Sequence, residues 1–129
     1  MKIILNNEIE LSPILATGGK KFVQGVNRDT ISFVFPMETS MDEIDSVFTE
    51  ENCETITIVD GNNQYIHKGY TVRAELKREP VEVTPATESE SAVYENRVIV
   101  SMSQRTYVET QMAAMKAAID LLYLEDAEV

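Results

Sequence analysis

The chain has 129 residues, 43% of them hydrophobic, and a formal net charge of −11. This length and apolar content favour one domain, residues 1–129, with its own core, and the acidic balance argues against nucleic acid as a direct ligand. The single cysteine, Cys53, cannot form an internal disulfide, and no apolar run approaches a membrane span, so we expect no membrane partner.

The first third of the chain predicts β segments joined by turns. In KIILNNEIEL, residues 2–11, short apolar runs flank Asn6-Asn7, which tolerates positive φ, and this pattern predicts a small hairpin. Gly18-Gly19 in ATGGKKF predicts a second turn. TISFVFP predicts a strand over residues 30–35, because proline ends the run.

A short helix is predicted over TSMDEIDSVF. Ser40 stands three residues before Glu43, which is the spacing of a capping box. Apolar residues then recur at helical spacing and form one stripe, which comprises Met41, Ile44, Val47 and Phe48. We expect this helix to form a small lid between two β segments.

The longest β pattern runs from Glu54 to Val83. Apolar and polar residues alternate through most of it, and Asp60-Gly61 is a strong turn signal. Gly69 interrupts the return strand, as a bulge or a tight bend would. The pattern predicts one long hairpin, and Pro80 predicts that the end of its return strand lies at a sheet edge.

Residues 84–92, TPATESESA, predict a flexible polar loop. The alternative is an arm that orders only against a neighbouring subunit. VYENRVIVSMS then predicts a strand. One face of that strand holds Tyr94, Asn96, Val98, Val100 and Met102.

The end of the sequence predicts a helix that starts at a second capping box, Thr106 to Glu109. Apolar residues follow at four-three-four-three spacing, and the stripe comprises Val108, Met112, Met115, Ile119 and Leu122. We expect this stripe to cover the sheet of its own domain. A helix–helix contact between subunits is the alternative.

Together these elements predict an α+β fold, an antiparallel β-sandwich or barrel with a long hairpin, one short helix and a C-terminal helix. If the hairpin is an assembly element, its strand edge supplies main-chain hydrogen bonds to a neighbour. The candidate assembly surface then comprises Tyr65, His67, Tyr70, Arg73, Glu75, Val81 and Val83.

The sequence offers no recognisable catalytic or metal-binding pattern. His67 is the only histidine, and one cysteine with scattered carboxylates does not complete a ligand set. GGKK lacks the upstream glycine and the following Ser or Thr of a phosphate loop. We therefore expect no enzyme activity, no cofactor and no metal, and we expect Cys53 to be a buried or incidental thiol.

The run GYTVRAELKREPVEVTPATESESAVYENRVIVSMSQRTYVETQMAAM, residues 69–115, resembles small structural proteins of long-tailed bacteriophages and of prophage tail modules. The resemblance implies a tube, terminator or baseplate component that forms homo-oligomeric rings with other tail proteins as partners. It also implies synthesis in the cytoplasm of a bacterial host and a place in the virion. The start, MKIILNNEIEL, is too short for the apolar part of a signal peptide, which fits that expectation.

Acidic residues are concentrated in two segments, which keeps a second hypothesis open. Glu38–Glu54 holds seven acidic and no basic residues, and Glu79–Glu95 holds five acidic and no basic residues. In a ring, acidic walls would let DNA pass without adhesion. In the alternative, the chain is a small acidic adaptor that holds a basic protein partner.

Overall fold

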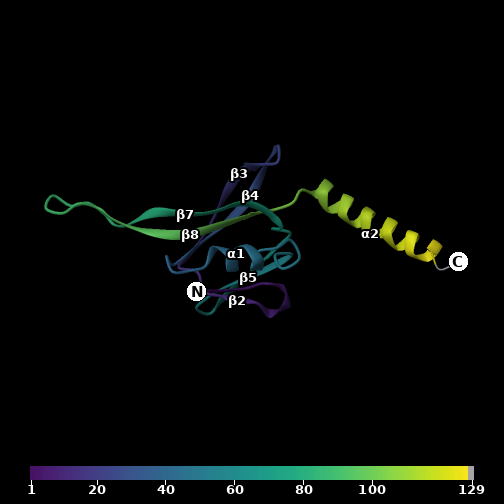
Figure 1. Ribbon diagram of the computed structural model, residues 1–129, viewed down its shortest axis with the longest axis horizontal. Helices are drawn as coiled ribbons and strands as arrows, with labels where there is room; N and C mark the ends of the chain where they lie inside the picture. The colour runs from purple at the N-terminus through teal and green to yellow at the C-terminus, as the bar shows by residue number, and fades with distance from the viewer. Residues whose placement is uncertain (128–129) are drawn as a thin grey trace.

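The computed structural model describes residues 1–127, with side chains through Ile119. Two four-stranded antiparallel sheets form a sandwich-like body. A two-stranded ribbon leaves this body at one end, and a long helix leaves it at the other (Figure 1). The predicted α+β class, with a short helix and a C-terminal helix, is confirmed, and a long hairpin is present over residues 72–103.

The first sheet has the order β2-β1-β5-β6. β1 (Lys2–Ile4) pairs with β2 (Glu10–Leu11) across a short 3₁₀ turn, η1 (Asn6–Glu8), in which Asn7 has a φ of 65°. The predicted N-terminal hairpin is therefore confirmed. β5 (Thr55–Asp60) and β6 (Asn63–Lys68) complete the sheet through the turn predicted at Asp60-Gly61.

The second sheet has the order β3-β4-β8-β7. Its strands are β3 (Leu15–Val23), β4 (Val26–Phe35), β7 (Val72–Thr84) and β8 (Val93–Ser103). The turn predicted at Gly18-Gly19 is wrong, because both glycines lie inside β3 and pair with β4. The turn lies instead at Gln24-Gly25, where both residues adopt positive φ.

The predicted single hairpin over residues 54–83 is also wrong. β5 and β6 form a short hairpin, and the chain then turns at Gly69, whose φ is 80°, and crosses to the second sheet. There β7 pairs with β8 and lies at the edge, as Pro80 predicted. Alternation shows which residues share a face of a strand but not which strand is its partner, so the pattern could not reveal this change of sheet.

The hydrophobic core lies between the sheets and is closed by α1 (Met41–Val47). Ser40 caps this helix as predicted, accepting a hydrogen bond from the Glu43 N–H at 3.3 Å. The ring of Phe48 lies 5.6 Å from that of Phe33, centroid to centroid, in a tilted arrangement. Fully buried residues of both sheets and α1 meet here, among them Ile3, Ile44, Ile56, Val98, Val100 and Met102.

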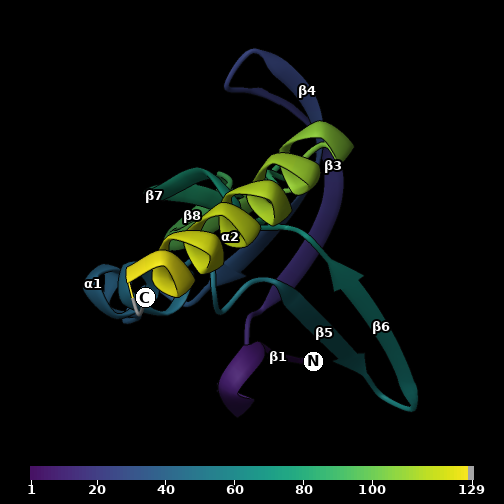
Figure 2. The same cartoon turned by 90° about the vertical axis from the view of Figure 1, so that its right-hand side faces the viewer.

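The C-terminal helix α2 (Tyr107–Ala127) does not cover a sheet, so that prediction is wrong. It projects from the end of β8 (Figures 1 and 2), and its residues 111–119 are all exposed. Val108, Met112, Met115 and Ile119 of the predicted stripe face solvent, and Leu122 lies outside the described side chains. The apolar spacing predicted that one face would be buried, but it contained no information on what would bury it.

Candidate assembly surface

Six of the seven residues predicted for assembly lie on edge strands of two different sheets. Tyr65 and His67 are on β6, and four others are on β7, and both strands are sheet edges. Tyr70 lies in the crossover between them. The rings of Tyr70 and His67 form a T-shaped pair with a centroid distance of 5.6 Å. The residues therefore occupy two edges that can accept a further strand.

Two of the seven side chains, Arg73 and Glu75, make hydrogen bonds within the described part of the chain. Arg73 donates to Asp45 Oδ1 at 2.9 Å and to the Phe48 carbonyl oxygen at 2.7 Å, which ties β7 to the end of α1. Glu75 accepts from Lys21 at 2.6 Å and pairs with Lys77 at 2.8 Å, and these hydrogen bonds lower its pKa. Arg73 and Glu75 thus stabilise the body.

The distal part of β7 and β8, residues 79–97, extends beyond the last β4–β8 pair at Val98. We call this segment the ribbon (Figure 1). The predicted face of β8 continues into it, so that Val98 is buried whereas Tyr94 on the same face is 58% exposed. Val83 and Val93 are exposed beside it. The predicted polar loop forms the tip, with a turn in which the Thr87 N–H donates to the Glu90 carbonyl oxygen at 2.9 Å.

At the other end of the body, one buried arginine anchors α2. The Arg28 guanidinium, on a side chain that is 2% exposed, donates to both carboxylate oxygens of Glu109. It also donates to the Val23 carbonyl oxygen at 2.9 Å. The hydrogen bond from Arg28, followed by the one from the Thr106 N–H, lowers the pKa of Glu109 from 4.5 to about 2.

The predicted capping box of α2 is confirmed. Thr106 Oγ1 accepts from the Glu109 N–H at 3.2 Å, and the Glu109 carboxylate accepts from the Thr106 N–H at 2.9 Å. Glu109 therefore satisfies the helix terminus and Arg28 at once. The capping partner was visible in the sequence, whereas Arg28, on β4, had no local signal.

The residues before α2 bind to β4 and to the residues that flank the β5–β6 hairpin. The Gln104 N–H donates to the Asp29 carbonyl oxygen at 2.8 Å, and the Arg105 N–H donates to the Gly69 carbonyl oxygen at 2.9 Å. The Arg105 side chain pairs with Glu54. Because these contacts hold residues 104–109 from several sides, α2 leaves the body in a defined direction.

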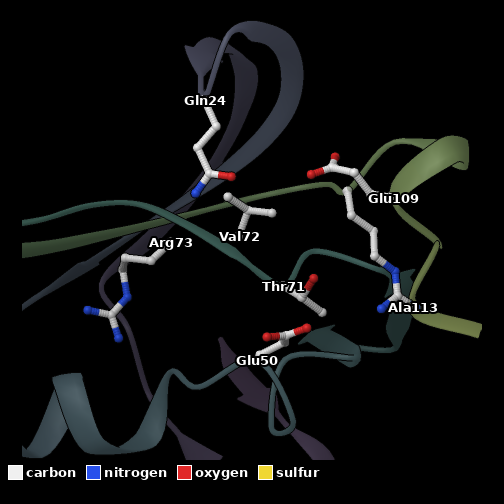
Figure 3. Close-up of a pocket in the computed structure, with 8 residues that line it drawn as sticks. Gln24, Glu50, Thr71, Val72, Arg73, Glu109 and Ala113 are labelled. Atoms are coloured by element: carbon white, nitrogen blue, oxygen red, sulfur yellow. The ribbon is translucent and has the colours of Figure 1, made fainter. Parts of the chain in front are cut away.

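A polar cavity of about 330 Å³ lies at the base of α2 (Figure 3). Its lining comes from the β3–β4 turn, the segment between α1 and β5, the crossover, β7, the segment before α2, and α2 itself. It comprises Gln24, Glu50, Thr71, Val72, Arg73, Arg105, Glu109 and Ala113. Among the described residues, the buried Nε atoms of Arg73 and Arg105 have no hydrogen-bond partner. Two smaller hollows beside it also contain Arg105.

Cys53 lies in the core of the body. The Cys53 side chain is 0% exposed, and burial raises the pKa of its thiol to about 12. Among the side chains that the structure describes, those of residues 1–119, no group of three or more His, Cys, Asp or Glu is placed to hold a metal ion. No helix within residues 1–127 is long and apolar enough to cross a membrane.

Comparison of the chain with protein-family models, with curated proteins and with solved structures finds no match. A functional proposal therefore depends on the arrangement of the exposed arms and edges.

Proposed function

We propose that this chain is a non-enzymatic structural protein that assembles into oligomers, as a component of a phage or prophage tail. One observation carries the proposal. The ribbon and α2 leave opposite ends of the body (Figure 1), and both have exposed apolar side chains. Clustered exposed apolar surface marks interaction sites in soluble proteins.

The core of the body does not include the ribbon or α2, so both arms are free to bind other molecules. The core is closed by the two sheets and α1 alone, without the ribbon or α2. Burying exposed apolar surface is worth roughly 25 cal/mol per Å², so covering both arms in a contact is favourable. Open edges at β6 and β7 provide backbone donors and acceptors for further pairing.

The assignment to a tail is supported by the resemblance of residues 69–115 to small tail proteins and by the net charge of −11. An acidic inner wall would not bind the phosphate backbone of passing DNA. Assembly from one kind of subunit requires surfaces on the chain that are complementary to each other. Head-to-tail contacts between two such surfaces close into rings when the rotation permits.

Light scattering coupled to size-exclusion chromatography tests this proposal over a broad range of protein concentration. We expect masses that are multiples of the 14.5 kDa chain, with a defined ring at high concentration. A chain that stays monomeric throughout, but binds a basic protein in a salt-sensitive manner, would instead support the acidic adaptor.

A further inference from the structure

We propose that the free edge of β6 pairs with β6 of a second copy of this chain, antiparallel and about a two-fold axis beside Ile66. The inference rests on the proposed function, because it names one contact through which the chain would assemble. The two sheets that contain β6 would then join into one continuous sheet across the contact.

β6 is the last strand of its sheet and has a hydrogen-bonded neighbour, β5, on one side only. Figure 2 shows β6 at the outer side of the sheet, and no other described strand lies beyond it. Five of its six residues are exposed, and His67 is partly buried. A strand in this position presents unpaired N–H and C=O groups that another strand can bind.

The register with β5 shows which backbone groups of β6 are already used. The Gly69 N–H, directly after β6, donates to the Glu54 carbonyl oxygen at 2.9 Å. In an antiparallel pair, residues that exchange hydrogen bonds with the neighbouring strand alternate with residues that do not. Counting back from Gly69 in steps of two, the residues of β6 that bond to β5 are His67, Tyr65 and Asn63.

The N–H and C=O groups of Gln64, Ile66 and Lys68 therefore point toward the free edge. The Lys68 carbonyl oxygen accepts a hydrogen bond from the Gln104 side chain at 3.3 Å, which agrees with this direction. A carbonyl oxygen has two lone pairs, so it can accept a second hydrogen bond. The free edge thus offers three residues for pairing with another strand.

The other three edge strands have features that hinder such pairing. β7 contains Pro80, which has no N–H, and its register shifts at two places. β3 carries Lys20 and Lys21 in its middle, and β2 has only two residues. β6, with the sequence NQYIHK, has no proline, no acidic residue and a single lysine at its end. β6 is therefore the edge that is best suited to accept a strand.

The residues at this edge fit a second copy of β6. In an antiparallel pair, outward-pointing groups of one strand face outward-pointing groups of the other. The register that pairs all three outward residues places Ile66, 62% exposed, opposite its equivalent, and Gln64 opposite Lys68. The one formal charge of the strand then faces a neutral side chain, and Tyr65 lies opposite His67 on the other face.

A charge exchange at Ile66 tests both the edge and the register. Because the axis places this position opposite itself, Ile66→Lys or Ile66→Glu alone puts like charges opposite each other, which is destabilising. We expect each variant to be monomeric by light scattering at concentrations at which the wild type has twice the 14.5 kDa mass or a larger even multiple. An equimolar mixture should regain the dimer, because opposite charges then face each other.

Matched controls make the same changes away from β6. Ser91→Lys and Ser91→Glu lie at the exposed tip of the ribbon, and both should assemble like the wild type. Raising the salt concentration should strengthen the wild-type dimer, because both copies carry −11. Salt would weaken the binding of a basic partner, so this response also separates the dimer from the acidic adaptor.

Gln64→Glu tests the register without a change at Ile66. It places a carboxylate opposite Lys68 in two symmetry-related pairs, and we expect it to tighten the dimer by about 2- to 30-fold. Circular dichroism checks that each variant is folded, and Gln64→Glu decides the matter if a variant at Ile66 is not. An unchanged or weaker dimer in Gln64→Glu would contradict the register.

The other outcomes distinguish the inference from the proposed function. If the wild type assembles and both folded variants at Ile66 assemble equally well, the contact does not use the β6 edge, although the proposed function stands. If each variant is monomeric and their mixture is monomeric too, the two-fold pairing about Ile66 is wrong. A wild type that is monomeric at every concentration removes the proposed function and the inference together.

Discussion

Arg28 binds both carboxylate oxygens of Glu109 across a sequence separation of 81 residues. Arg28 lies on β4 and Glu109 in the first turn of α2, so this pair joins the body to the projecting helix. The two partners differ in environment, because the arginine side chain is 2% exposed and the glutamate side chain 36% exposed.

Acidification should loosen the base of α2. The folded-state pKa of Glu109 is lowered to about 2 from 4.5, so its contribution to stability is complete above pH 4.5 and is lost as the pH falls toward about 2. Amide hydrogen exchange at residues 107–110 should accelerate in that window. In Glu109→Gln the added acid sensitivity should disappear, and an unchanged acid response in that variant would contradict the assignment.

Removing the glutamate should destabilise the protein more than removing the arginine. Glu109→Ala leaves a buried guanidinium without its counter-charge, whereas Arg28→Met leaves a carboxylate that water can solvate. We expect Glu109→Ala to lower the free energy of unfolding by about 1–3 kcal/mol, and Arg28→Met to lower it less. Urea denaturation at neutral pH measures both, and the reverse order would show that the buried charge is not the controlling factor.

Phe48 should be a major contributor to the stability of the body. Its ring contacts Phe33 and lies edge-on to Phe35 at 6.1 Å, and it is 1% exposed. Phe48→Ala should therefore reduce the free energy of unfolding by about 3–5 kcal/mol. Tyr65→Ala, at an exposed position on β6, is the matched aromatic control and should change it by less than about 1 kcal/mol. Similar losses in both variants would contradict this account of the core.

Cys53 should report on unfolding. The thiolate is the reactive form, and burial both raises the thiol pKa to about 12 and blocks access to it. We expect a thiol reagent at mildly alkaline pH to label the native protein very slowly and the urea-unfolded protein rapidly. Labelling of the native protein should accelerate in Phe48→Ala, whereas rapid labelling of the folded wild type would contradict the burial.

The parts of the fold that were predictable depend on residues close together in sequence. Ser40 and Thr106 each cap a helix through a residue three positions later, and Val98, Val100 and Met102 alternate onto a buried face. Pro80 excludes a central strand wherever its neighbours lie, because it has no N–H to donate. For each of these features, the residues that cause the structure are the same few neighbouring residues that form the sequence pattern.

The candidate site was predictable only in part. The β6 and β7 residues were correctly placed on strands, and β7 on an edge, but Arg73 and Glu75 make contacts with α1 and β3 that no spacing indicated. The polar hollows at the base of α2 combine residues of β3, β4, the crossover and the helix start. Such a site is formed by segments far apart in the chain. The spacing of residues in the sequence does not indicate which of these segments lie close together in the folded protein.

The sequence by itself determined the helices, most strands and the exposed polar tip, because capping, alternation and proline geometry act over a few residues. Only the tertiary structure decided that β7 pairs with β8 and that α2 projects from the body. Those outcomes depend on contacts between distant segments. β8 offers β7 a longer partner than β6 does, and Arg28 on β4 pairs with Glu109 in the first turn of α2, where the helix leaves the body.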